Sequence, residues 1–77
     1  MSKKNKDLEV MEKSVTIQRD GKNYSASEFW LGKKCMGTIV DLDGNFEVTV
    51  EPEKTTMRVR NFSDGIEYLL KEWNLHQ

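Results

Sequence analysis

Few residues of this chain have the chemistry of a catalytic or metal-binding site. The sequence holds one histidine, His76, and one cysteine, Cys35. A zinc site takes about four ligands, and a nucleophilic cysteine needs a positioned base beside it. Asp41 and Asp43 precede Gly44, but the residues after this glycine do not continue the oxygen-ligand pattern of a calcium loop. The sequence therefore predicts a protein that is not an enzyme and has no metal or cofactor.

Two pairs of basic residues could contact a nucleic acid. Lys33 and Lys34 lie at a predicted turn, and Arg58 and Arg60 share one face of a predicted strand. Small antiparallel sheets can place such side chains in a groove or against bases. These four residues define the nucleic-acid alternative.

The charge balance favours a solvated face over a nucleic-acid site. Glu47 and Glu51 lie on the exposed side of the neighbouring predicted strand, where cross-strand pairing with Arg58 and Arg60 would neutralise the arginines. The formal net charge of the chain is −1, which provides no global attraction to phosphates or to anionic membranes.

Several apolar residues have no obvious place in so small a core. Trp30 stands between Phe29 and Leu31, and neighbouring residues of a strand point to opposite faces. If Phe29 and Leu31 face the core, Trp30 faces outward and could anchor a protein partner. The other interpretation is that the first strand or a long lysine side chain covers it. Met36 and Tyr68 are further candidate contacts.

The pattern between these residues predicts a sheet. Alternating apolar residues predict strands from Leu8 to Ile17, with an irregularity near Lys13 and Ser14, and again in four later segments, at about 24–31, 35–42, 46–51 and 57–60. Asp20-Gly21 and Asp43-Gly44-Asn45 are typical hairpin turns. Gly37 inside the third strand suggests the close approach of a bulky group, for which Trp73 is the candidate.

The end of the chain predicts one amphipathic helix. Ile66, Leu69, Leu70 and Trp73 have the spacing that places large apolar groups on one helical face, and Ser63 is the expected N-cap. The fold class is therefore α+β: a small antiparallel β-meander of four or five strands with the C-terminal helix on one face. The predicted core is Val15, Ile17, Phe29, Leu31, Ile39, Phe46, Val48, Val50, Met57, Val59, Phe62, Ile66, Leu69, Leu70 and Trp73.

With 77 residues, the chain has room for one core. We expect a flexible basic tail at residues 1–6 and a single domain at 7–77. A lone cysteine and the lack of an apolar run after the basic start favour the cytoplasm. No apolar segment approaches the length needed to cross a membrane, so no membrane association is expected.

Three stretches resemble a known family. They are Met1-Ser2-Lys3-Lys4-Asn5-Lys6, then Leu31-Gly32-Lys33-Lys34 with Gly37-Thr38-Ile39, and Glu72-Trp73-Asn74-Leu75-His76-Gln77. With these the chain resembles the short uncharacterised proteins of lactic acid bacteria and their relatives that form the domain of unknown function 2969 family. The resemblance implies a bacterial cytoplasmic protein and transfers no activity, cofactor or site residue.

The sequence favours a non-enzymatic interaction or accessory protein. An open sheet has edges whose unpaired backbone groups can accept a strand from a protein partner or from a second copy of the chain. The alternative is a small nucleic-acid-binding module that uses the two basic pairs.

Overall fold

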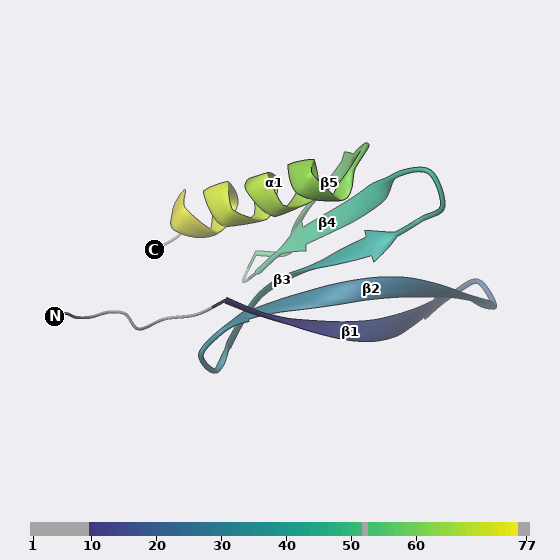
Figure 1. The fold of residues 1–77 in the computed structure, drawn as a ribbon, viewed down its shortest axis with the longest axis horizontal. Coiled ribbons are helices and arrows are strands. Elements are labelled where there is room, and N and C mark those ends of the chain that lie inside the picture. Colours follow the sequence, from purple (N-terminus) through teal and green to yellow (C-terminus); the bar gives the residue numbers. More distant parts are fainter. Residues whose placement is uncertain (1–9, 52, 76–77) are drawn as a thin grey trace, which may run out of the picture.

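The computed structural model describes residues 10–51 and 53–75, and these form a five-stranded antiparallel sheet and one helix (Figure 1). The predicted fold class is confirmed. The elements in chain order are β1 (Val10–Arg19), β2 (Lys22–Leu31), β3 (Lys34–Asp41), β4 (Phe46–Val50), β5 (Thr55–Val59) and α1 (Phe62–Leu75). Residues 1–9, on which the expected tail falls, lie outside the described part.

The sheet is a simple meander in which each strand pairs with the next, so β1 and β5 are its two edges. Asp20 and Gly21 both have positive φ, 51° and 79°, as a two-residue hairpin turn requires. This turn closes a regular ladder in which Val10 lies opposite Leu31 and Arg19 opposite Lys22. The irregularity expected in the first strand is therefore wrong.

The irregularity of the sheet lies between β2 and β3. Phe29 pairs with Gly37 and Trp30 pairs with Cys35, so Met36 is an extra residue on β3. Such a bulge places one more residue on the same side of the strand than strict alternation allows. Met36 is turned into the core and is 1% exposed. The expectation that Met36 lies outside the core is wrong for this reason.

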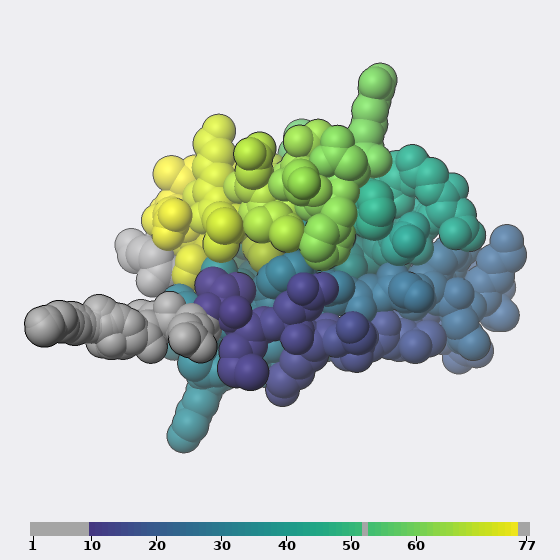
Figure 2. All heavy atoms as spheres, in the orientation of Figure 1, coloured from purple at the N-terminus to yellow at the C-terminus, as the bar shows by residue number. Residues whose placement is uncertain are grey.

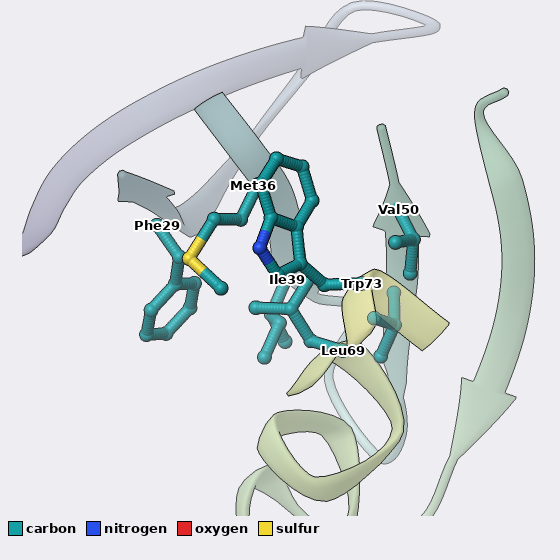
Figure 3. Packing of buried hydrophobic residues seen from close by; sticks show 7 residues of the cluster. Phe29, Met36, Ile39, Val50, Leu69 and Trp73 are labelled. Carbon is teal, nitrogen blue, oxygen red and sulfur yellow. The ribbon is translucent and has the colours of Figure 1, made fainter. Parts of the chain in front are cut away.

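The core lies between α1 and the sheet. The helix packs mainly on β4, with β3 and β5 on either side. Figure 3 shows side chains from β2, β3, β4 and α1 meeting in this layer. The buried cluster consists of Phe29, Met36, Ile39, Val48, Val50, Leu69 and Trp73.

Gly37 permits a close approach of α1 and β4 to β3. A methyl group at this position would lie 2.5 Å from Cδ1 of Leu69 and would also overlap the backbone oxygen of Thr49. A close approach at Gly37 is confirmed, but the residue above it is Leu69 and not Trp73.

Two members of the predicted core are exposed. Met57 lies on the edge strand β5 and is 47% exposed, and Leu70 is 38% exposed at the side of the helix. Val15 and Ile17 are half-buried and lie on the face of the sheet opposite the helix. Every other predicted core residue is buried or half-buried.

Asn61 caps the helix, in place of the expected Ser63. Its side-chain oxygen accepts a hydrogen bond from the backbone N–H of Asp64 at 2.8 Å, and its backbone oxygen accepts one from Gly65 at 3.2 Å. An Asn side chain at this position satisfies one of the unpaired N–H groups of the first turn. The helix therefore starts at Phe62, and the apolar stripe extends back to this residue.

Candidate interaction edge and groove

The free edge of β1 exposes a regular series of backbone groups. Arg19 and Lys22 flank a two-residue turn and so form a hydrogen-bonded pair, and this pattern alternates along an antiparallel ladder. The odd-numbered residues of β1 therefore bond to β2. The N–H and C=O groups that point away from the sheet belong to the edge positions, Val10, Glu12, Ser14, Thr16 and Gln18.

The side chains at the edge positions share the helix side of the sheet. Ser14 lies opposite Ser27, and Ser27 lies opposite Ile39, which is buried beneath the helix. Directly opposite residues of an antiparallel sheet have side chains on the same face. The odd-numbered residues, from Met11 to Arg19, therefore face the open side.

A groove of about 400 Å³ lies on the helix side, next to β1. It forms because α1 packs on β3, β4 and β5 and, among the described residues, leaves part of the helix-side face of the β1–β2 hairpin open (Figure 1). In the space-filling view, the purple surface of β1 runs along the margin below the yellow-green surface of α1 (Figure 2). The groove is lined by Glu12, Ser14, Val15, Thr16, Ser25, Ala26, Ser27, Ile39, Asp41, Phe46 and Phe62.

The two walls of this groove differ in polarity. The hairpin wall carries hydroxyl groups, and the hydroxyl of Ser27 donates a hydrogen bond to a carboxylate oxygen of Glu12 at 2.7 Å. The opposite wall is aromatic, because the ring of Phe62 packs against the rings of Phe29 and Phe46, with centroids 6.1 and 5.9 Å apart. The groove thus suits small polar side chains next to the edge of β1.

The open side of the hairpin carries the predicted anchor, Trp30. This residue is half-buried, and the ammonium group of Lys13 lies 4.8 Å from its ring centroid. The indole N–H donates a hydrogen bond to Glu28 at 3.2 Å. A lysine therefore partly covers Trp30, which was the second interpretation of the sequence. Met11, opposite Trp30 in the ladder, is 59% exposed.

The other two candidate partner contacts, Met36 and Tyr68, pack in or against the core. Met36 belongs to the core, and Tyr68 is half-buried and packs against the same cluster. Burial is the main cause that raises the pKa of Tyr68 above its ordinary value. Burial likewise raises the pKa of the Cys35 thiol, which disfavours the reactive thiolate at neutral pH.

The structure does not bring the two basic pairs together. Lys33 lies in the β2–β3 turn and Lys34 begins β3, at the end of the sheet where Glu51 bonds to Met36. Arg58 lies opposite Glu47 toward the other end of the sheet, and Arg60 follows β5 there. Relative to the Gly37–Val50–Thr55 row, the pairs extend in opposite directions along the strands. Each strand residue adds about 3.3 Å, so the two pairs form separate patches.

Glu47 forms the longest-range ion pair in the described part of the chain. Arg58 is its neighbour across the ladder, as expected, but the hydrogen bond to Glu47 comes from Arg19 at 2.5 Å. This hydrogen bond is the main cause that lowers the pKa of Glu47 and raises that of Arg19. Glu51 pairs with Lys54 at 3.1 Å and not with an arginine of β5.

The Arg19–Glu47 pair is also evidence for the shape of the β1–β2 hairpin. It connects β1 to β4 across two intervening strands. The row between them contains Ala26 and Val40, which are buried although they point away from the helix. Strong twist of the long hairpin across the open face accounts for both observations. Sequence reasoning missed this contact because no local pattern encodes it.

Within residues 10–51 and 53–75, no group of three or more His, Cys, Asp or Glu side chains is arranged to hold a metal ion. His76 lies outside these residues. No helix in the described part is long and apolar enough to cross a membrane.

These features define a small antiparallel α+β domain with one long edge strand, which no other described strand covers, and a groove beside it. The chain belongs to the family described as Protein of unknown function (DUF2969), whose model matches residues 1–76. The family that the sequence resembles is thereby confirmed. No curated protein and no solved structure matches the chain significantly.

Proposed function

We propose that this protein is a non-enzymatic interaction module that binds an extended protein segment along the free edge of β1. The observation that carries the proposal is the edge itself. β1 is ten residues long and regular over its whole ladder, whereas the opposite edge strand, β5, has five residues. Unpaired N–H and C=O groups on such an edge can bond to an added strand, and side-chain pockets beside it supply selectivity.

The two faces of β1 specify what kind of strand would fit. On the open face, β1 carries the apolar side chains of Met11, Val15 and Ile17, with Lys13 between the first two. On the helix side, the added strand would meet the hydroxyl-lined groove. A fitting partner therefore has apolar residues at alternate positions and small polar residues between them.

A proline at an edge position tests the proposal without breaking the sheet. The N–H of Thr16 points away from β2, so Thr16→Pro removes a donor from the free edge and leaves the β1–β2 ladder paired. The matched control is Thr56→Pro. Because Thr55 closes the β4–β5 ladder opposite Val50, the alternation makes Thr56 an edge position on β5.

The assay is affinity capture with wild-type, Thr16→Pro and Thr56→Pro baits from nuclease-treated and untreated bacterial lysate. We expect a discrete protein partner that survives nuclease, is retained by Thr56→Pro and is lost with Thr16→Pro. Circular dichroism confirms that each variant is folded. Retention of the partner by Thr16→Pro would contradict the role of β1.

The same experiment includes the nucleic-acid alternative. If capture disappears with nuclease and weakens steeply between about 50 and 200 mM salt, the binding site lies at the basic residues Lys33, Lys34, Arg58 and Arg60 and not at β1. Their position in separate patches, with Arg58 opposite Glu47, supports the protein-binding proposal instead.

A further inference from the structure

The strand pattern that fits the edge of β1 is also the pattern of β1 itself. Its odd-numbered positions carry Met11, Val15 and Ile17 together with Lys13, and its edge positions include Ser14 and Thr16 together with Glu12. We propose that the partner strand is β1 of a second copy, so that two chains form a symmetric dimer with one continuous ten-stranded sheet. This inference rests on the proposed function of the β1 edge and names its partner.

Symmetry restricts the possible registers. A two-fold axis perpendicular to the sheet keeps each side chain on its own face, so it must pass through a residue position of β1. With the axis at any residue of β1, the edge positions of one chain lie opposite those of the other, so their backbone groups can bond. An axis at Ser14 pairs the whole segment from Val10 to Gln18 with its copy.

The Ser14 register gives favourable neighbours on both faces. On the open face, Met11 of one chain lies opposite Ile17 of the other, which covers a methionine that is 59% exposed in the single chain. On the helix side, Glu12 lies opposite Thr16, and Ser14 lies opposite itself. No two like charges are directly opposite, and about ten backbone hydrogen bonds form, since each bonded pair exchanges two.

Closure of the assembly also favours pairing of β1 with β1 over pairing of β1 with β5. Pairing of β1 with β5 of a second copy would leave a free β1 and a free β5 at the ends and would extend into an open filament. Pairing of β1 with β1 uses the same surface on both chains and stops at the dimer. Both helices then lie on the same face of the joined sheet.

A cysteine at the symmetry axis tests the register directly. Ser14→Cys is made in a Cys35→Ser background, so that the new thiol is the only one. Opposite Cα atoms of a hydrogen-bonded pair are about 5.5 Å apart, which is within the range of a disulfide. The matched control is Thr16→Cys in the same background. In this register its two copies are displaced by about 13 Å along the strands.

Mild oxidation followed by a non-reducing gel detects covalent dimers of the cysteine variants. Sedimentation of the wild-type chain over a micromolar to millimolar concentration series gives its oligomeric state. We expect a wild-type dimer, its loss in Thr16→Pro, a covalent dimer from Ser14→Cys and little from Thr16→Cys. Equal crosslinking of the two cysteine variants would overturn the register. A wild-type chain that stays monomeric over the series would overturn the dimer.

The two proposals fail separately. If the wild-type chain is monomeric but Thr16→Pro still loses a captured protein, the β1 edge binds a different partner and only the dimer is wrong. If Thr16→Pro changes neither the sedimentation nor the capture, the interaction role of β1 is wrong as well.

Discussion

Replacement of Gly37 by alanine tests the packing that places α1 on the sheet. The added methyl group would overlap the backbone oxygen of Thr49 and would lie 2.5 Å from Cδ1 of Leu69. Overpacking of this kind costs about 1–3 kcal/mol, and the upper end applies because a backbone atom cannot move aside. The lower chain entropy of alanine in the unfolded state returns about 0.5–1 kcal/mol. The net loss is thus about 2 kcal/mol.

This loss is large for so small a domain. A chain of 77 residues has a stability of about 4–11 kcal/mol, and a loss of about 2 kcal/mol lowers the Tm by roughly 8–16 °C. Gly65→Ala is the matched control. Its methyl group would meet only side-chain carbons, those of Ile39 and Val48 at 3.2 Å and that of Val59 at 3.5 Å, and alanine favours the helix.

Thermal and urea denaturation of both variants give the answer. We expect Gly37→Ala to be clearly destabilised and Gly65→Ala to stay within about 1 kcal/mol of the wild type. A Gly37→Ala protein as stable as the wild type would refute the close approach of Leu69 and Thr49.

Two further predictions concern the helix face and the long-range ion pair. Trp73→Ala should cost about 3–5 kcal/mol of unfolding free energy, as for other buried large aromatics. Leu70→Ala should cost less than about 1.5 kcal/mol, because the Leu70 side chain is 38% exposed. Equal losses of the two variants in urea denaturation would mean that the helix face is wrongly assigned. Because Arg19 lowers the pKa of Glu47, the pair stabilises the fold above the ordinary carboxyl pKa of 4.5 and loses this effect as the pH falls below it. Glu47→Gln should therefore lower stability near neutral pH and lose less than the wild type on acidification, and an unchanged pH profile would contradict the pair.

The sequence was sufficient for the elements of the fold because each has a local signal. Alternation gave the strands, Asp20-Gly21 gave a hairpin turn, and the spacing from Ile66 to Trp73 gave the helix. The errors arise where a local rule competes with packing. The sequence left Met36 without a place in so small a core, but the bulge opposite Phe29 places it inside.

The candidate site was only partly predictable. An available sheet edge follows from a meander, and an outward Trp30 follows from alternation. The groove beside β1 depends on how far α1 extends across the sheet, which no spacing in the sequence encodes. The same is true of the contact between Arg19 and Glu47, since it depends on the twist of the β1–β2 hairpin.

Amide hydrogen exchange along β1 tests the central claim most directly. In dilute solution, we expect slow exchange at Val15 and Ile17, whose N–H groups bond to β2, and fast exchange at Ser14 and Thr16, whose N–H groups form the free edge. On association, the amides of Ser14 and Thr16 should become protected while those of Val15 and Ile17 change little. If the amides of Ser14 and Thr16 still exchange fast in the complex, β1 is not the binding edge.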